Sequence, residues 1–132
     1  MSQKSEPRLM IAEDDFIISL FLETVLKEAG YPVLDLLSSG ESVLKAIEAQ
    51  KPDCVLMDIG LSGKLNGVEV ALILRQKYQV PVIFLTGNSD ILFREERLVE
   101  IQPLATWIKP IDDLFMLAEM ERMFTESREN AM

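Results

Sequence analysis

The chain contains no histidine among its 132 residues. This absence excludes a histidine-based catalytic triad, a histidine-ligated zinc site and a phosphohistidine formed on this chain. The single cysteine, Cys54, lies inside a predicted strand, which favours a buried structural thiol over a reactive one. Cysteine usage therefore gives no sign of an oxidising compartment. Any metal site must be built from oxygen ligands, which suit Mg²⁺ or Mn²⁺.

Basic clusters and long apolar runs are also missing. The net charge is −9, and lysine and arginine never cluster beyond two residues, which argues against nucleic-acid binding. No run is long and apolar enough to span a membrane, and the polar N-terminus does not resemble a secretory signal. We therefore expect a cytoplasmic protein that acts on neither nucleic acid nor membranes.

The length suits one domain, in which short apolar runs alternate with helical stretches. We expect strands over residues 8–12, 33–37, 54–57, 82–85 and 105–108. We expect helices over 16–29, 41–50, 68–78 and 91–101, and a last helix that Asp112 caps and that runs to about 125. Such a series predicts an α/β fold, a doubly wound five-stranded parallel sheet with helices on both faces. Residues 1–7 are expected to be a disordered lead-in and 126–132 a frayed tail.

Polar residues follow or end four of the predicted strands. Glu13 and Asp14 follow the first strand, Asp58 ends the third, Thr86 follows the fourth and Lys109 the fifth. Parallel sheets bind ligands outside the carboxyl ends of their strands, so these side chains should converge at one edge. Each alone is commonly a solvated turn or a helix cap. Their order and spacing together indicate a site for a divalent cation and a phosphoryl group.

The residue types suit phosphoryl transfer to a carboxylate. A carboxylate can attack phosphorus and form an acyl phosphate, and the transition state mainly needs cations and donors in position. Glu13 and Asp14 would hold Mg²⁺, and Asp58 would be both a metal ligand and the nucleophile. Lys109 would pair with one phosphoryl oxygen, and the hydroxyl of Thr86 would donate to another.

Over about residues 8–125 the chain resembles the receiver domain of response regulators, the phosphoacceptor module of two-component signalling. The residues that carry the resemblance are Glu13-Asp14, Asp58, Gly67, Thr86-Gly87 and Lys109-Pro110. The resemblance implies a flavodoxin-like fold with strand order 2-1-3-4-5. It also implies that a histidine kinase or phosphotransfer protein phosphorylates Asp58, and that a downstream protein partner reads the result.

The resemblance assigns roles to further residues. The backbone carbonyl of Gly60 would be a metal ligand, and Gly87, without a side chain, would leave the phosphorus accessible. Gly60 and Asn88 stand where side chains of the family flank the attacking water, so we expect them to influence the lifetime of the phosphorylated form. Asp15 is a third acid after the first strand. Counting back from Gly30, which ends the first helix, favours Asp14 as direct ligand, Glu13 as outer ligand and Asp15 as helix cap.

Two positions depart from the family pattern. The loop after Asp58 has Ser62 where a proline is common, and it holds an additional residue, with Gly63 inside it. The family's switch aromatic is replaced by Thr106, and the aromatic residue Trp107 follows it. Neighbours on a strand face opposite sides, so Trp107 is expected in the core.

Four functional hypotheses are compatible with these residues. A stand-alone receiver is favoured, because the chain starts with Met and ends in a charged tail without a linker. The alternative is a receiver cut from a hybrid histidine kinase or a multidomain regulator. A Mg²⁺-dependent phosphatase of the haloacid-dehalogenase type is disfavoured, because Gly60 occupies the place of its second aspartate. The fourth reading is a flavodoxin-like scaffold without phosphoryl chemistry.

An output surface is expected on the helix 91–101, the strand 105–108 and the last helix. Met116, Met120, Met123 and Phe124 recur at helical spacing and form the predicted core stripe of the last helix. Leu114, Phe115 and Leu117 are apolar residues beyond that stripe. They either widen the core-facing stripe or form a contact patch for a partner or for a homodimer.

Overall fold

Five parallel strands form one sheet in the order β2-β1-β3-β4-β5, as predicted. The computed structural model describes residues 6–88, 90 and 95–130. The strands are β1 (Leu9–Ala12), β2 (Val33–Leu37), β3 (Cys54–Asp58), β4 (Val82–Thr86) and β5 (Ala105–Ile108). Because every neighbouring pair is parallel, all carboxyl ends lie at the same edge of the sheet.

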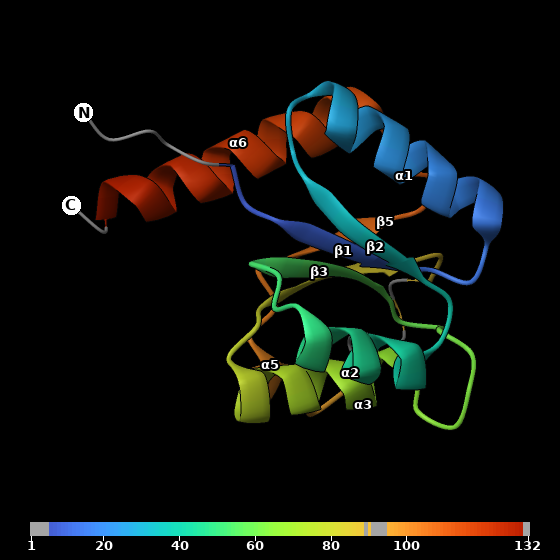
Figure 1. Ribbon diagram of the computed structural model, residues 1–132. Helices are drawn as coiled ribbons and strands as arrows, with labels where there is room; N and C mark the ends of the chain where they lie inside the picture. The colour runs from blue at the N-terminus through green and yellow to red at the C-terminus, as the bar shows by residue number, and fades with distance from the viewer. Residues whose placement is uncertain (1–5, 89, 91–94, 131–132) are drawn as a thin grey trace.

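Helices cover both faces of the sheet (Figure 1). α1 (Phe16–Glu28) and α6 (Asp113–Asn130) lie on one face. The other face carries α2 (Gly40–Ala49), α3 (Gly67–Ile73) with its π-helical continuation η1 (Leu74–Tyr78), and α5 (Leu98–Ile101). Among the described residues, none of these helices combines the length and the hydropathy that crossing a bilayer requires.

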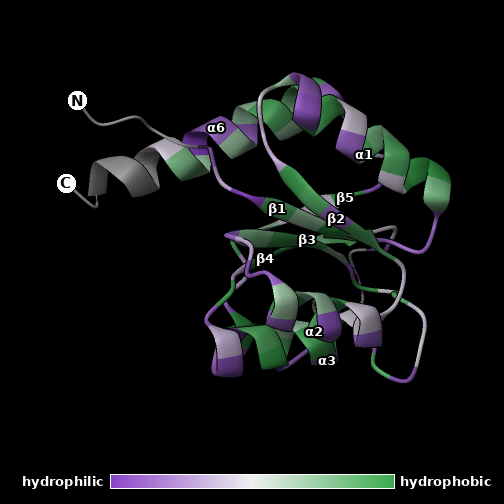
Figure 2. Ribbon diagram, viewed as in Figure 1, coloured by the Kyte–Doolittle hydropathy of each residue, from purple (hydrophilic) through white to green (hydrophobic). Residues whose placement is uncertain are grey.

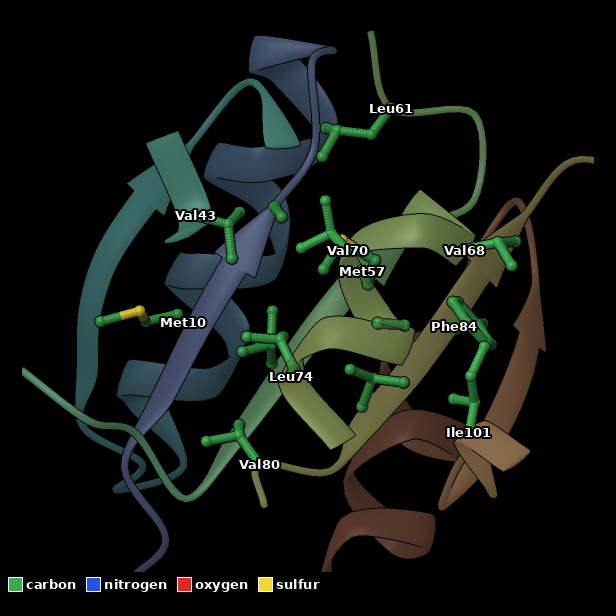
Figure 3. Close-up of a cluster of buried hydrophobic side chains, with 14 of the residues drawn as sticks. Met10, Val43, Met57, Leu61, Val68, Val70, Leu74, Val80, Phe84 and Ile101 are labelled. Atoms are coloured by element: carbon green, nitrogen blue, oxygen red, sulfur yellow. The ribbon is translucent and has the colours of Figure 1, made fainter. Parts of the chain in front are cut away.

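The alternation of side chains along the strands divides the core into two clusters. Leu9 and Ile11 of β1 pack towards α1 and α6, whereas Met10 and Ala12 pack towards α2 and α3. Figure 3 shows the second cluster, in which side chains from the sheet meet side chains from the helices. Trp107 belongs to the first cluster and is only 2% exposed, which confirms its predicted core position.

Side-chain caps start the helices where the sequence predicted them. Asp15 caps α1, and its Oδ1 accepts hydrogen bonds from the backbone N–H groups of Ile17 and Ile18 at 3.0 and 3.3 Å. Asp112 precedes α6 and accepts from the N–H of Phe115 at 2.8 Å. Because Asp15 is used as a cap, Glu13 and Asp14 are the acids of this segment left to face the sheet edge.

Gly67 permits the start of α3 to lie directly beside the end of β3. A Cβ atom at this position would lie 2.2 Å from the carbonyl oxygen of Asp58 and 3.0 Å from the Cα of Ile59, so any side chain would collide with backbone. The N–H of Gly67 donates to the carbonyl of Ile59 at 3.3 Å. This hydrogen bond joins the two ends of the loop between β3 and α3 next to Asp58.

Several boundaries differ from the prediction. The helix expected over 68–78 is α-helical only to Ile73 and then continues as η1. Within the helix expected over 91–101, the described residues form α5 over Leu98–Ile101, and residues 91–94 lie outside the described residues, as do 1–5 of the lead-in. The last helix runs five residues past the expected end, to Asn130, because no glycine or proline interrupts the segment.

Cys54 is fully buried in β3, as predicted for a structural thiol. Burial raises the pKa of its thiol. The thiolate form that reacts with electrophiles is therefore disfavoured at neutral pH.

Candidate functional site

The register of the sheet brings the acidic residues together. β1 and β3 are paired so that Ala12 lies opposite Met57, and the next positions along these two strands are Glu13 and Asp58. One carboxylate oxygen each from Glu13, Asp14 and Asp58 lies within 4.8 Å of the others. Glu13 and Asp58 are buried, whereas Asp14 is exposed. The convergence predicted from the strand ends is therefore present.

Lys109, which directly follows β5, joins this cluster. Its Nζ donates to both carboxylate oxygens of Glu13, at 2.8 and 3.1 Å, and lies 3.5 Å from Oδ2 of Asp58. Its backbone N–H donates to the carbonyl of Thr86 at 2.8 Å, which fixes the end of β5 against the end of β4. The peptide bond that follows, to Pro110, is cis. The ammonium group thus bridges two carboxylates that come from different strands.

Burial and charge set the protonation of this cluster. Burial raises the pKa of Glu13, the neighbouring Asp58 raises it further and Lys109 lowers it, with a net value of about 7. Burial lowers the pKa of Lys109, but its hydrogen bond to Glu13 and the charge of Asp58 outweigh burial, so the pKa is raised overall. Lys109 is therefore a permanent cation near neutral pH, whereas Glu13 is close to its titration midpoint.

Thr86 ends β4 at the same edge, and its side chain is bound within its own loop. Its hydroxyl donates to the backbone carbonyl of Asn88 at 2.9 Å and accepts from the backbone N–H of Asn88 at 3.0 Å. Thr86 is only 3% exposed. The residue is where the sequence predicted it, but in this state its hydroxyl is engaged by the loop and not by the carboxylate cluster.

The two glycines of the site differ in their surroundings. The N–H of Gly60 donates to Oδ1 of Asp58 at 3.0 Å, so the loop turns back onto the carboxylate. A Cβ atom added at Gly87 would meet no atom within 4 Å. This openness fits the predicted access to the phosphorus. A contact between the Gly60 carbonyl and a metal, and an effect of Gly87 or Asn88 on lifetime, stay predictions.

The donor set fits a hard divalent cation. Glu13, Asp14 and Asp58 supply carboxylate oxygens, which are the ligands that Mg²⁺ prefers. When Glu13 is ionised, the three carboxylates outnumber the single ammonium group of Lys109, and a divalent cation would neutralise the excess negative charge. These residues would hold the ion, and its charge would compensate that of an entering phosphoryl group.

The predicted apolar patch on α6 is partly exposed. Leu114 is 75% exposed and Phe115 is 52% exposed, whereas Leu117 is half-buried and packs against the core. The predicted core residues Met116 and Met120 are fully buried. Leu114 and Phe115 are therefore surface residues, and the wide-stripe interpretation is correct only for Leu117.

The sequence interpretation missed a second exposed apolar group at the start of α1. Phe16 is 68% exposed and Ile17 is 78% exposed, and Figure 2 draws the first turns of α1 in the colour of hydrophobic residues. A groove of about 500 Å³ lies beside them. Its lining is Ile17, Ile18, Phe21, Lys109, Pro110 and Ile111. The signal was the run Phe16-Ile17-Ile18, because three adjacent helical residues cannot all face one core.

Comparison with known families places most of the chain in one of them. Residues 9–120 match the family model of the response regulator receiver domain. Among curated proteins, the transcriptional regulatory protein PdtaR of Mycobacterium tuberculosis is 31% identical over 117 residues, which cover 86% of this chain and 55% of PdtaR. The transcriptional regulatory protein AfsQ1 of Streptomyces coelicolor is 38% identical over 84 residues, 64% of this chain and 36% of AfsQ1. The chain thus spans about half or less of the length of these relatives.

Solved structures give the same result. The signal receiver domain of a modulated diguanylate cyclase from Desulfovibrio desulfuricans superposes with a TM-score of 0.83 at 28% identity, covering 95% of this chain and 98% of that domain. The receiver domain of a sensor histidine kinase from Pseudomonas aeruginosa superposes with a TM-score of 0.72 at 25% identity, covering 89% and 97%. That structure has a magnesium ion coordinated in its active site cleft.

Magnesium affinity should depend on pH through Glu13. With a pKa of about 7 in the metal-free site, this carboxyl is mostly protonated at pH 6 and mostly ionised at pH 8. A metal must displace that proton, so the dissociation constant for Mg²⁺ should rise about tenfold from pH 8 to pH 6. Isothermal titration calorimetry at the two pH values measures this ratio.

The variant Glu13→Gln is the control, because an amide does not titrate. Its affinity for Mg²⁺ should be lower at pH 8 and nearly independent of pH. The chain has no histidine that would supply a competing titration in this range. Equal affinity of the wild type at the two pH values would contradict the assignment of Glu13 to the site.

Proposed function

Because the chain belongs to the response regulator receiver family, we propose that Asp58 accepts a phosphoryl group from the phosphohistidine of a histidine kinase or phosphotransfer protein, and that the reaction requires Mg²⁺. Receiver domains are signalling phosphoacceptors, not classical enzymes. The observation that carries the proposal is the convergence of Asp58 with two further carboxylates and the ammonium of Lys109.

The chemistry follows from the positions of these groups. A carboxylate oxygen of Asp58 forms a bond to phosphorus while the bond from phosphorus to the donor imidazole nitrogen breaks, and that nitrogen keeps the electron pair. Bound Mg²⁺ would neutralise the negative charge that gathers on the phosphoryl oxygens. Lys109, now 3.5 Å from Oδ2 of Asp58, would pair with one of those oxygens. Glu13 would keep the ammonium group at the site through its two short hydrogen bonds.

Thr86 would change partners when Asp58 is phosphorylated. Its hydroxyl now donates to the carbonyl of Asn88, and that bond must break before it can donate to a phosphoryl oxygen. Because Thr86 lies opposite Ile108 in the ladder of β4 and β5, its movement would be felt at the exposed end of β5. Phosphorylation is thereby proposed to bias a surface between two states.

The alternatives are separated by single features. Gly60 carries no carboxylate, so the general acid of a haloacid-dehalogenase-type phosphatase is absent from its expected place. A stand-alone receiver remains our proposal, with a receiver from a longer regulator or hybrid histidine kinase as the alternative. The chain spans about half or less of the length of the curated relatives, so the alternative predicts further domains in the intact protein.

Asp58→Asn should abolish phosphorylation. Incubation with a small-molecule phosphodonor and Mg²⁺ should add one phosphoryl group to the wild type, read by intact mass, and none to the variant, because an amide is not a nucleophile here. Asp53→Asn is the matched control. Asp53 is an exposed aspartate that precedes the same strand, and its side chain pairs with Arg8 away from the site. Undiminished labelling of Asp58→Asn would refute the assignment.

Gly60 and Asn88 are proposed to set the lifetime of the acyl phosphate. Gly60 has no side chain to orient or exclude the attacking water, and Asn88 follows Thr86 by two residues. Gly60→Arg and Asn88→Ala should each change the half-life of the phosphorylated form by a few-fold without preventing its formation. The measurement is the loss of labelled phosphate over time. If both variants had the half-life of the wild type, Gly60 and Asn88 would not control the lifetime of the acyl phosphate.

The proposed output surface lies on α5, β5 and α6. Apolar side chains on these elements and on the segment between α5 and β5 are exposed to solvent. They are Val99, Leu104, Ile108, Leu114 and Phe115. Exposed apolar groups of this extent often mark interaction sites. A downstream protein that binds them in one state, or a second copy of the chain, would read the phosphorylation of Asp58.

Phe115→Ser should weaken binding of the downstream partner about tenfold, a loss of about 1.4 kcal/mol, while leaving phosphorylation of Asp58 intact. The affinity is measured with and without beryllofluoride, which mimics the phosphoryl group. Phe16→Ser is the matched control, because Phe16 is an exposed phenylalanine on α1, outside this surface. If only Phe16→Ser lost binding, the partner would bind α1 and not the proposed output surface.

A further inference from the structure

The loop that follows Asp58 is attached to α2 by one side chain. Oε1 of Glu41, in the first turn of α2, accepts hydrogen bonds from the backbone N–H groups of Lys64 and Leu65, at 2.8 and 3.0 Å. Lys64 and Leu65 follow Glu41 by 23 and 24 residues in the sequence. Glu41 therefore holds the middle of a loop whose beginning forms part of the site.

The two ends of this loop are fixed in other ways. At its start, the N–H of Ile59 donates to the carbonyl of Leu85 at 3.0 Å, and Leu61 is buried in the core. At its end, Gly67 donates to Ile59. Between them, residues 62–64 are exposed and contribute no side chain to the core clusters. The backbone in the middle is ordered by Glu41 and by the partly buried Leu65.

Glycines permit the close approach on both sides of this contact. Gly63 has a φ of +115°, and a Cβ atom there would lie 2.6 Å from Oε2 of Glu41. Gly40, at the start of α2, faces the carbonyl oxygen of Leu65, which a Cβ atom would approach to 2.6 Å. A side chain at Gly40 would meet the backbone of the loop and push it from α2, whereas at Gly63 the positive φ, which L side chains rarely adopt, opposes a side chain.

The carboxylate of Glu41 is well suited to this contact. Its own backbone N–H and those of Leu65 and Lys64 donate to it and lower its pKa. The carboxylate also lies at the helix N-terminus, where the helix dipole favours negative charge. Glu41 is therefore ionised over the neutral pH range, and the contact does not depend on pH there.

We propose that Glu41 is a positioning residue for the metal site, which holds the loop so that Gly60 presents its backbone carbonyl at the cluster of Glu13, Asp14 and Asp58. The inference rests on the proposed function, in which that carbonyl is a metal ligand. The N–H of Gly60 donates to Asp58 at 3.0 Å and that of Leu61 to the Asp58 carbonyl at 3.2 Å, and two exposed residues, 62 and 63, separate this turn from the amides that Glu41 binds. Outer residues that orient metal ligands commonly matter for affinity.

The test measures Mg²⁺ affinity by calorimetry and backbone hydrogen exchange at Lys64 and Leu65 in the metal-free protein. Glu41→Ala should raise the Mg²⁺ dissociation constant about tenfold and speed exchange at both amides. Phosphorylation by a small phosphodonor should slow at low Mg²⁺ and return to the wild-type rate at saturating Mg²⁺. A general loss of stability would not give that recovery.

Two variants separate hydrogen bonding from charge. Glu41→Gln keeps an acceptor oxygen and should retain most of the Mg²⁺ affinity. Glu48→Ala removes a carboxylate from the far end of the same helix, where it contacts Tyr78, and should bind Mg²⁺ as the wild type does. Gly63→Ala keeps Glu41 but strains the loop backbone, because an L residue rarely adopts a φ of +115°, so its affinity should fall as in Glu41→Ala.

Wild-type Mg²⁺ affinity in Glu41→Ala would overturn the proposal, and so would an equal loss in Glu41→Gln, because charge alone would then explain the effect. Wild-type affinity in Gly63→Ala would overturn it as well, and this variant decides the matter if Glu41→Ala does not fold. If the wild-type protein binds Mg²⁺ but takes no phosphoryl group at Asp58, the proposed function fails, and the titrations still decide the role of Glu41.

Discussion

The site depends on the ammonium group of Lys109, which lies between the carboxylates of Glu13 and Asp58. Two buried carboxylates whose oxygens lie within 4.8 Å of each other would repel when both are ionised, and burial itself disfavours the ionised form. One cation from β5 compensates both, and it can do so only because the parallel sheet places the ends of β1, β3 and β5 at one edge. Burial, the largest cause, and the neighbouring Asp58 nevertheless raise the pKa of Glu13 to about 7. A divalent cation, which prefers carboxylate oxygens, would compensate the ionised form of Glu13 together with Asp14 and Asp58.

Phosphorylation of Asp58 would alter this balance more than metal binding does. An acyl phosphate carries more negative charge than the carboxylate that it replaces, so the demand for cations and donors rises at the same point. The ammonium group of Lys109, at the end of β5, and the hydroxyl of Thr86, at the end of β4, can supply this charge and hydrogen bond. Both groups now have other partners. Because Lys109 is joined to Thr86 by a backbone hydrogen bond of 2.8 Å, the two responses are mechanically linked. Of the exposed apolar residues of the proposed output surface, Ile108 lies on β5, directly before Lys109.

Much of the fold and the site could be predicted from the sequence, since strand ends in a parallel sheet converge whatever the details of packing. Asp58, Glu13 and Lys109 needed only the right strand boundaries, and Trp107 needed only the alternation of side chains. The strand order came from the family resemblance and not from periodicity. The contact of Glu41 with the loop could not be predicted, because an exposed glutamate in a first helical turn is ordinary and its partners are backbone amides.

The exposed residues of α1 show a different limit. An amphipathic helix was expected over 16–29, and nothing in its period reveals which of three adjacent apolar residues will face solvent. The structure resolves this: Ile18 packs against the core, while Phe16 and Ile17 are exposed. Their position is informative, since Ile17 lines a groove that Lys109, Pro110 and Ile111 complete. The residue that compensates Asp58 is therefore also a wall of a surface groove. The side chain that bridges Glu13 and Asp58 thus also contributes to the lining of this groove, beside the exposed start of α1.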